Sequence, residues 1–285
     1  MLDAHIHLWD GPDGPDTFYG KLQDAGFSGG SLISRAPESF LVGMQSRRTA
    51  AERVDEVLQW CSGMEELYPL FWIDPLEDGA VDQVHMAAES GVLGFKVICD
   101  RYFPGDDTAM TVYSAIAALG KPLLFHSGIL WDGKVSSKFN RPGEFESMLE
   151  VDKLIFALAH ISWPWTNECI AVYGKFLNAV GRRPGLSSEM YVDVTPGTPP
   201  IYREDALMKL TMTGYDIADN VLFGVDSMAS NYNPGWAGEW IQRDSDILDR
   251  LGLSDIKSRY FGDNLKRFLG LIDIEKEKAV PHPGQ

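Results

Sequence analysis

Eight short apolar runs recur along the chain and constrain its fold more than any other feature of the sequence. Most are apolar at successive rather than alternate positions, which is typical of parallel β-strands covered on both faces. The runs lie at residues 2–8, 30–33, 70–73, 94–98, 122–125, 154–159, 190–194 and 221–225. We interpret them as eight strands.

Stretches with helical periodicity separate five of the seven pairs of neighbouring runs. Residues 50–67, for example, carry apolar side chains at Val54, Val57 and Leu58, which is the spacing of one helix face. The other four stretches lie at residues 81–90, 108–119, 167–180 and 204–212. A strand followed by a helix, repeated, implies parallel strands joined by right-handed crossovers. Eight such units predict an α/β fold, a (β/α)8 TIM barrel.

The length of the chain fits a single barrel. Barrels of this kind commonly run to about 250 residues or more as one domain, and this chain has 285 residues, 45% of them hydrophobic. No Gly/Ser-rich linker or shift in composition divides it. We therefore expect one domain over residues 1–285, with a polar tail from about Glu275 that we expect to fray.

Charge and composition exclude several classes of function. The 41 acidic residues outnumber the 25 Lys and Arg residues by 16, so the surface would repel nucleic acid. No stretch approaches the roughly 20 apolar residues of a membrane span. The first residues lack the basic and apolar regions of a signal peptide. Three widely spaced cysteines, Cys61, Cys99 and Cys169, favour the reducing cytoplasm.

Polar residues stand in or at the end of five consecutive runs. Lys96 lies in the fourth run, His126 and His160 follow the fifth and sixth, and Asp193 and Asp226 follow the seventh and eighth. The successive spacings are 30, 34, 33 and 33 residues, about one strand–helix unit each. Equivalent positions on neighbouring strands converge on one mouth of a barrel, where the active site lies in nearly every characterised example. We expect these side chains to meet there.

His5 and His7 add two imidazoles from the first run. Residues two apart on a strand point to the same face, and neutral imidazole is the commonest metal ligand. A single histidine on an apolar strand is more often a hydrogen-bonded core residue, but four histidines at strand ends together with Asp226 favour a metal site. Three imidazoles and a carboxylate suit Zn²⁺, with Mn²⁺ and Fe²⁺ as alternatives.

This constellation resembles the amidohydrolase superfamily, in particular its amidohydrolase-2 branch, which includes aminocarboxymuconate semialdehyde decarboxylase-like metal-dependent TIM-barrel enzymes. The similarity spans nearly the whole chain. The segments that carry it are Asp3-Ala4-His5-Ile6-His7, Gly94-Phe95-Lys96, Leu124-Phe125-His126-Ser127-Gly128, Arg141-Pro142-Gly143-Glu144-Phe145, Ala157-Leu158-Ala159-His160, Leu222-Phe223-Gly224-Val225-Asp226-Ser227 and Gly262-Asp263-Asn264-Leu265-Lys266-Arg267-Phe268-Leu269-Gly270-Leu271.

The resemblance implies a set of residue roles. It implies one divalent metal ion, held by His5, His7, His126 and Asp226. Asp226 would orient a metal-activated water and accept its proton, and His160 would act as hydrogen-bond donor or general acid. A carboxylated Lys96 could instead bridge a second ion, with His126 and His160 holding that ion; we favour one metal. The compact barrel would lack the accessory β-sandwich that many amidohydrolases carry.

The resemblance leaves the reaction open between three alternatives. The first is hydrolysis of a C–O or C–N bond in a lactone, ester or amide. The second is non-oxidative decarboxylation of an aromatic or unsaturated carboxylic acid, which the same branch performs with much the same ligands. The third, from a different class, is a metal-binding barrel without catalytic activity.

Loop residues after the strands predict a pocket for a small, cyclic or aromatic, carboxylated molecule. Trp9 and Trp131 would line it, and Arg101 and Arg141 would bind a carboxylate, although each arginine could equally brace its own loop. We expect a small-molecule substrate. A homodimer is an open alternative, because dimers are common among resembling proteins.

Overall fold

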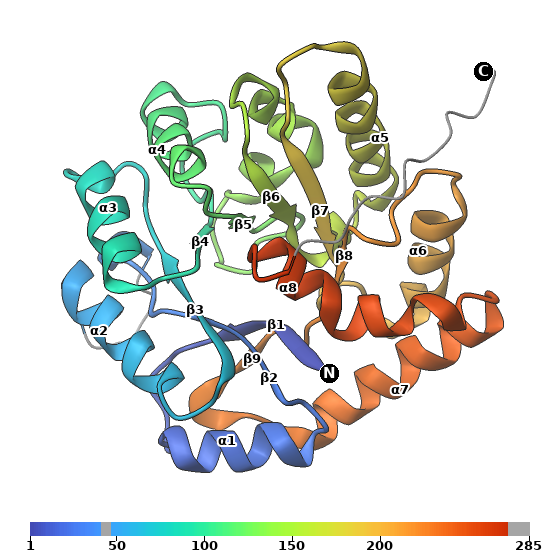
Figure 1. Cartoon of the computed structure of the whole chain (residues 1–285), viewed down its shortest axis with the longest axis horizontal. Coiled ribbons are helices and arrows are strands. Elements are labelled where there is room, and N and C mark those ends of the chain that lie inside the picture. The colour runs from blue at the N-terminus through green and yellow to red at the C-terminus, as the bar shows by residue number, and fades with distance from the viewer. Residues whose placement is uncertain (41–46, 273–285) are drawn as a thin grey trace.

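The computed structural model describes residues 1–40 and 47–272, and the predicted tail from Glu275 lies outside this range. Helices surround a ring of parallel strands (Figure 1). The strands are β1 (Leu2–His7), β2 (Gly29–Ile33), β3 (Glu66–Trp72), β4 (Gly94–Val97), β5 (Leu123–Phe125), β6 (Ile155–Leu158), β7 (Glu189–Asp193), β8 (Val221–Leu222) and β9 (Ser227–Met228). The helices are α1 (Pro15–Asp24), α2 (Ala50–Cys61), α3 (Ala80–Ser90), α4 (Asp107–Ala118), α5 (Thr166–Arg182), α6 (Pro200–Met212), α7 (Pro234–Arg250) and α8 (Asn264–Phe268).

The sheet closes on itself through one chain segment, residues 221–228. Its strand order is β8-β7-β6-β5-β4-β3-β2-β1-β9. Within that segment β8 pairs with β7, whereas β9 pairs with β1 at the other end of the sheet. The backbone N–H of Ala4 also donates to the carbonyl of Phe223 at 2.9 Å. These contacts join the two ends of the sheet and confirm the predicted TIM barrel.

Three details differ from the predicted pattern. The run at residues 221–225 is not one strand, because β8 ends at Leu222 and the chain turns before β9. The first and last large helices, α1 and α7, were not predicted: α1 buries only Phe18 and Leu22, and α7 opens on Pro234 and Gly235, which are typical loop residues. Between β5 and β6, where no helical stretch was identified in the sequence, the chain forms a 3-10 helix, Pro142–Glu150.

Apolar side chains fill the barrel at the amino ends of its strands. Leu2, Leu70 and Tyr191 pack there with Leu265 and Phe268 from α8, and the Tyr191 and Phe268 ring centroids are 5.1 Å apart. Because this plug closes one end, a cavity can open only at the other, where the strands end.

A second apolar layer lies between the strands and the helices. Along β4, Phe95 and Val97 belong to this outer layer, so the intervening Lys96 faces the interior. The three cysteines are free and buried. No helix in the described part of the chain is both long and apolar enough to cross a membrane.

Candidate metal centre

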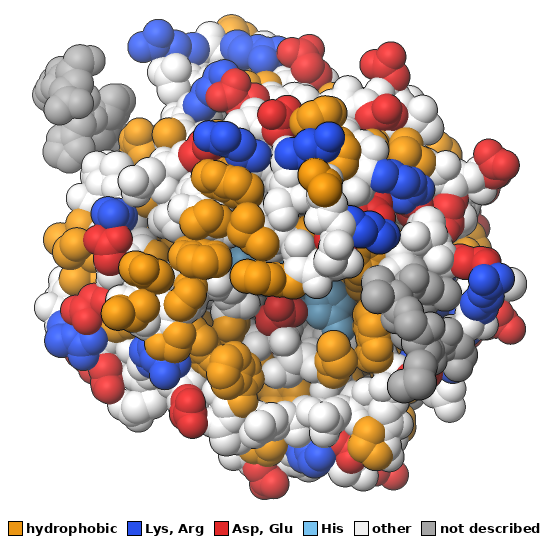
Figure 2. All heavy atoms as spheres, turned by 180° about the vertical axis from the view of Figure 1, so that it is seen from behind, with side chains coloured by type: hydrophobic (Ala, Val, Ile, Leu, Met, Phe, Trp, Pro, Cys, Tyr) orange, Lys and Arg blue, Asp and Glu red, His pale blue; other side chains and the backbone are white. Residues whose placement is uncertain are grey.

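A cavity of about 360 Å³ opens at the carboxyl ends of the strands. Figure 2 shows histidine and acidic side chains at the bottom of a hollow that apolar side chains surround. Six of the polar residues lining it are ones expected from the strands and their ends: His5, His7, Lys96, His126, His160 and Asp226; the loop residue Asp132 lines it as well. Trp9 and Trp131 also line the cavity, whereas Arg101 and Arg141 do not.

His5 is held by a carboxylate from β7, which is separated from β1 only by the segment that carries β8 and β9. Its Nδ1 lies 2.7 Å from Oδ2 of Asp193, and both side chains are fully buried. A carboxylate that accepts a hydrogen bond from one imidazole nitrogen fixes the proton on that nitrogen, so the other nitrogen keeps a free lone pair. Burial, reinforced by nearby Lys96, keeps the pKa of His5 well below its ordinary value. Neutral His5 therefore presents Nε2 as a ligand atom.

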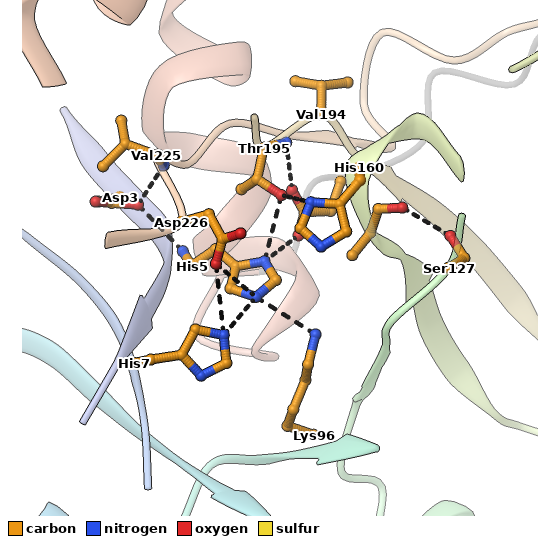
Figure 3. Close-up of polar contacts among 12 residues, drawn as sticks. Asp3, His5, His7, Lys96, Ser127, His160, Val194, Thr195, Val225 and Asp226 are labelled. Atoms are coloured by element: carbon orange, nitrogen blue, oxygen red, sulfur yellow. Dashed lines mark hydrogen bonds and ion pairs between the residues drawn. The ribbon is translucent and has the colours of Figure 1, made fainter. Parts of the chain in front are cut away.

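His7 and Asp226 converge on that nitrogen (Figure 3). Nε2 of His7 lies 3.1 Å from Nε2 of His5, and Oδ1 of Asp226 lies 3.5 Å from the former and 3.8 Å from the latter. Two imidazole nitrogens on one tetrahedral Zn²⁺ at about 2.0–2.1 Å would be roughly 3.3–3.4 Å apart. Burial lowers the pKa of His7 as well. These three donors fit one divalent cation.

The turn that carries Asp226 is tied to β1 by a buried carboxylate that sequence reasoning assigned no role. Oδ1 of Asp3 accepts the backbone N–H groups of Val225 and His5 at 3.0 and 3.1 Å, and the Tyr232 hydroxyl donates to Oδ2 at 2.9 Å. Asp226 itself has a φ of 51°, a left-handed conformation that costs energy in a residue with a side chain. Asp3 therefore helps to hold Asp226 over the two histidines.

Replacing Tyr232 with Phe is expected to lower the free energy of unfolding by about 1–3 kcal/mol, because Oδ2 of buried Asp3 loses its donor. Urea denaturation measures this change. Tyr202→Phe is the matched control, since the Tyr202 side chain is 53% exposed, and should change stability by less than about 0.5 kcal/mol. Equal effects of the two substitutions would refute the role of the Asp3 contact.

Lys96 is buried beside the same ligands. Its Nζ lies 3.4 Å from Nε2 of His5. Burial lowers the pKa of Lys96 to about 8, although the charges of Asp193 and Asp226 oppose this shift. Desolvation by the surrounding side chains likewise raises the pKa of Asp226, whose side chain is 33% exposed, and Lys96 opposes that shift. Lys96 is therefore a charge partner for the carboxylates, and it lies close enough to the donors to reach a cation if carboxylated.

His126 and His160 form the other side of the cavity floor. Their ring centroids are 4.9 Å apart, and His160 lies 5.4 Å from His5. Nε2 of His126 donates to the carbonyl of Ile129 at 3.2 Å, which leaves Nδ1 as its lone pair. His126 does not belong to the tight group of donors formed by His5, His7 and Asp226, so its role as a fourth ligand stays a prediction.

His160 is aimed into the cavity by an unusual backbone. It lies in the 3-10 segment Ala159–Ser162 after β6, where His160, Ile161 and Ser162 have φ values of 61°, 47° and 54°. The Ser127 hydroxyl supports this turn by donating to the carbonyl of Ala159 at 2.7 Å. Burial lowers the pKa of His160 to about 4, so the ring is neutral at pH 7.

The Thr195 hydroxyl connects two of the histidines. It lies 3.1 Å from Nδ1 of His160 and 3.4 Å from Nδ1 of His5. Thr195→Val is expected to lower kcat about 10-fold with little change in KM, because misplaced catalytic rings weaken the transition state more than substrate binding. Thr195→Ser should restore most of the rate. Thr198→Val is the control, since its buried hydroxyl has no hydrogen-bond partner among the described residues; an equal loss there would contradict the assignment.

Arg101 and Arg141, which the sequence predicted to bind a substrate carboxylate, do not line the cavity. The Arg101 guanidinium pairs with Asp74 and with Asp100, the latter at 2.9 Å. Arg141 pairs with Glu168 at 2.9 Å. Each arginine therefore braces its own loop, and apart from the adjacent Asp100 its partner lies 27 positions away in the sequence.

No family model matches the sequence, and no curated protein matches it. Solved structures of low sequence identity share its architecture, among them the following three. A probable 2-pyrone-4,6-dicarboxylic acid hydrolase from Acinetobacter baumannii, solved with citric acid bound, is 11% identical, with 94% of this chain and 98% of that chain covered and a TM-score of 0.60. An amidohydrolase from Burkholderia multivorans is 10% identical, with 95% and 99% covered and a TM-score of 0.62.

The third is the manganese-containing 5-carboxyvanillate decarboxylase from Novosphingobium aromaticivorans, at 10% identity, 88% and 79% coverage and a TM-score of 0.61. These structures cover most of the barrel. The likeness shows that the chain shares their TIM-barrel fold. In this barrel, β1 supplies His5 and His7, while the turn before β9 supplies Asp226.

Proposed function

We propose that the chain is a metal-dependent hydrolase of the amidohydrolase-2 type, which cleaves a C–O or C–N bond of a small cyclic or aromatic lactone, ester or amide. The observation that carries the proposal is the convergence of His5, His7 and Asp226 at the floor of the cavity. The likeness to a hydrolase and an amidohydrolase of the same fold supports it.

We propose that His5, His7 and Asp226 hold one divalent cation, with His126 as a further ligand. Zn²⁺ suits neutral imidazoles and a carboxylate, and Mn²⁺ is the alternative, since a protein of similar fold was solved with manganese. When bound, such a cation would polarise a substrate carbonyl and lower the pKa of water toward about 7.

The side chains around the donors have separate tasks in this proposal. Asp193 fixes the orientation of His5 through the 2.7 Å contact. Asp226 has a second carboxylate oxygen, which can take a proton from the attacking water and pass it to the leaving group. His160, neutral and held near Thr195, donates a hydrogen bond to the oxygen on which negative charge develops.

Non-oxidative decarboxylation is the second candidate, and the likeness to 5-carboxyvanillate decarboxylase favours it. In that reaction the same donors would orient a carboxylate, and a protonated acid would supply the proton that replaces CO2. The pKa of Asp226, raised by burial, would suit that acid. The two reactions therefore differ in the protonation state that they need at Asp226. Hydrolysis needs the ionised carboxylate, and decarboxylation needs the protonated acid.

The test is turnover before and after removal of metal. The chain is treated with a chelator, then reloaded with Zn²⁺ or Mn²⁺, and assayed on lactones, esters, amides and aromatic carboxylic acids. We expect metal removal to lower the hydrolytic rate at least about 100-fold, because a catalytic cation stabilises the transition state by several kcal/mol. Reloading the metal should restore the rate. Release of CO2 without hydrolysis would instead establish decarboxylation. Chelator-resistant turnover, or none on any substrate, would contradict the proposal.

We also propose that the protein works in a reducing compartment such as the cytoplasm. The three cysteines form no disulfide and are all buried, which supports this setting. A homodimer stays a prediction, and sedimentation velocity would test it.

A further inference from the structure

Positively charged side chains are scarce in the cavity. Lys96 is the sole Lys or Arg among the described residues that line it. The charges of Asp193 and Asp226 act on Lys96, so its positive charge is offset by two carboxylates. The loop arginines near the barrel mouth are paired elsewhere; Arg35, for example, contacts Glu56 at 2.7 Å.

A carboxylate without a cationic partner lies in the cavity wall. Asp132 follows β5 and lines the cavity. Its Oδ1 accepts hydrogen bonds from the Ser136 hydroxyl at 2.7 Å and from the backbone N–H of Lys134 at 3.0 Å. These bonds fix the carboxylate but do not neutralise it, and no ion pair recorded for the described residues includes Asp132. A second anion in the cavity would therefore meet a like charge.

Apart from Lys96, the histidines and the two aspartates, the described lining carries no charged side chain. The apolar wall includes Trp9, Phe40, Trp72, Ile98, Trp163 and Met228. It starts directly beside the metal centre, since the ring of Trp72 lies 5.5 Å from that of His7 and 4.9 Å from that of Phe40. Burying an unpaired charge against such a wall carries a large desolvation cost, whereas a flat ring fits it.

We propose that the cavity selects ring compounds with at most one acidic group, placed at the end that faces the histidines, and that Asp132 rejects a second acidic group. The inference rests on the proposed function in one respect, namely that the reacting end of the substrate lies at the metal centre. It narrows the substrate class to monoanionic or neutral aromatic acyl compounds and excludes dicarboxylates. Specificity of this kind comes from a repulsive element as much as from an attractive one.

The test compares two ligands that differ by one carboxylate, benzoate and isophthalate. Their binding to the zinc-loaded chain is measured by isothermal titration calorimetry. We expect benzoate to bind at least about 10-fold more tightly, because like charges in a partly desolvated site repel strongly. Asp132→Asn keeps the shape and the Oδ1 acceptor, and should tighten isophthalate until the ratio is about 3-fold or less.

Asp24→Asn is the matched control, because it removes the same charge from an exposed residue at the end of α1; the wild-type ratio should persist. Isophthalate binding as tightly as benzoate, an unchanged ratio in Asp132→Asn, or no benzoate binding would each overturn the inference. A chain that binds benzoate selectively but turns over no substrate would keep this inference and lose the proposed function.

Discussion

Asp226→Asn is expected to lower turnover at least about 1000-fold, because one residue loses both its role as a ligand and its role as a proton acceptor. Asn is nearly isosteric, so the turn held by Asp3 should persist. The measurement is kcat and kcat/KM on a substrate of the wild-type chain. An Asp226→Asn variant with more than about a tenth of wild-type kcat would refute the proton-transfer role.

The same substitution should not destabilise the fold. Desolvation at the cavity floor raises the pKa of Asp226 above its unfolded value, although the side chain is 33% exposed. At neutral pH the ionised side chain therefore does not favour folding of the metal-free chain. Removing that charge should leave the thermal midpoint of the metal-free protein unchanged or higher. A lowered midpoint together with lost activity would point to misfolding instead of lost chemistry.

His7→Ala is expected to abolish tight metal binding. His7 contributes one of the three clustered donors, and its Nε2 faces that of His5 at 3.1 Å. Loss of a ligand should reduce metal affinity by at least about 100-fold. Even the loss of a residue that only orients a ligand through a hydrogen bond typically reduces affinity or activity by about 10–100-fold. Metal content after dialysis, measured by mass spectrometry, should fall from about one ion per chain to below about one tenth.

His85→Ala is the matched control for that experiment. His85 lies on α3 and its side chain is exposed, so its removal takes away an imidazole without touching the cavity. Full metal content in His7→Ala, or an equal loss in His85→Ala, would contradict the ligand assignment.

The barrel could be predicted because its signal is repeated and local. Apolar runs such as that around Phe95 and Val97 are continuous, since parallel strands bury both faces, and their spacing matches one strand–helix unit. The eighth strand was predicted too simply. Its interruption between Leu222 and Ser227 depends on backbone contacts with β1, including that of Ala4 with Phe223, and such contacts leave no periodic trace in the sequence.

The floor of the cavity could be predicted for a related reason. His126 and His160 stand in register, and a barrel brings equivalent strand positions together. The supporting contacts could not be predicted, because Asp3 and Thr195 act through hydrogen bonds to residues more than 30 positions away. Sequence position also cannot show whether an arginine is already paired, which is why Arg101 was predicted to bind substrate.

We propose that one divalent ion binds between His5, His7 and Asp226. A crystal structure of the metal-loaded protein, with anomalous diffraction at the metal edge, would locate the ion. We expect one anomalous peak about 2.0–2.2 Å from Nε2 of His5 and from Nε2 of His7. Two peaks about 3.5–4 Å apart, bridged by a carboxylated Lys96, or no peak among these three side chains, would contradict it.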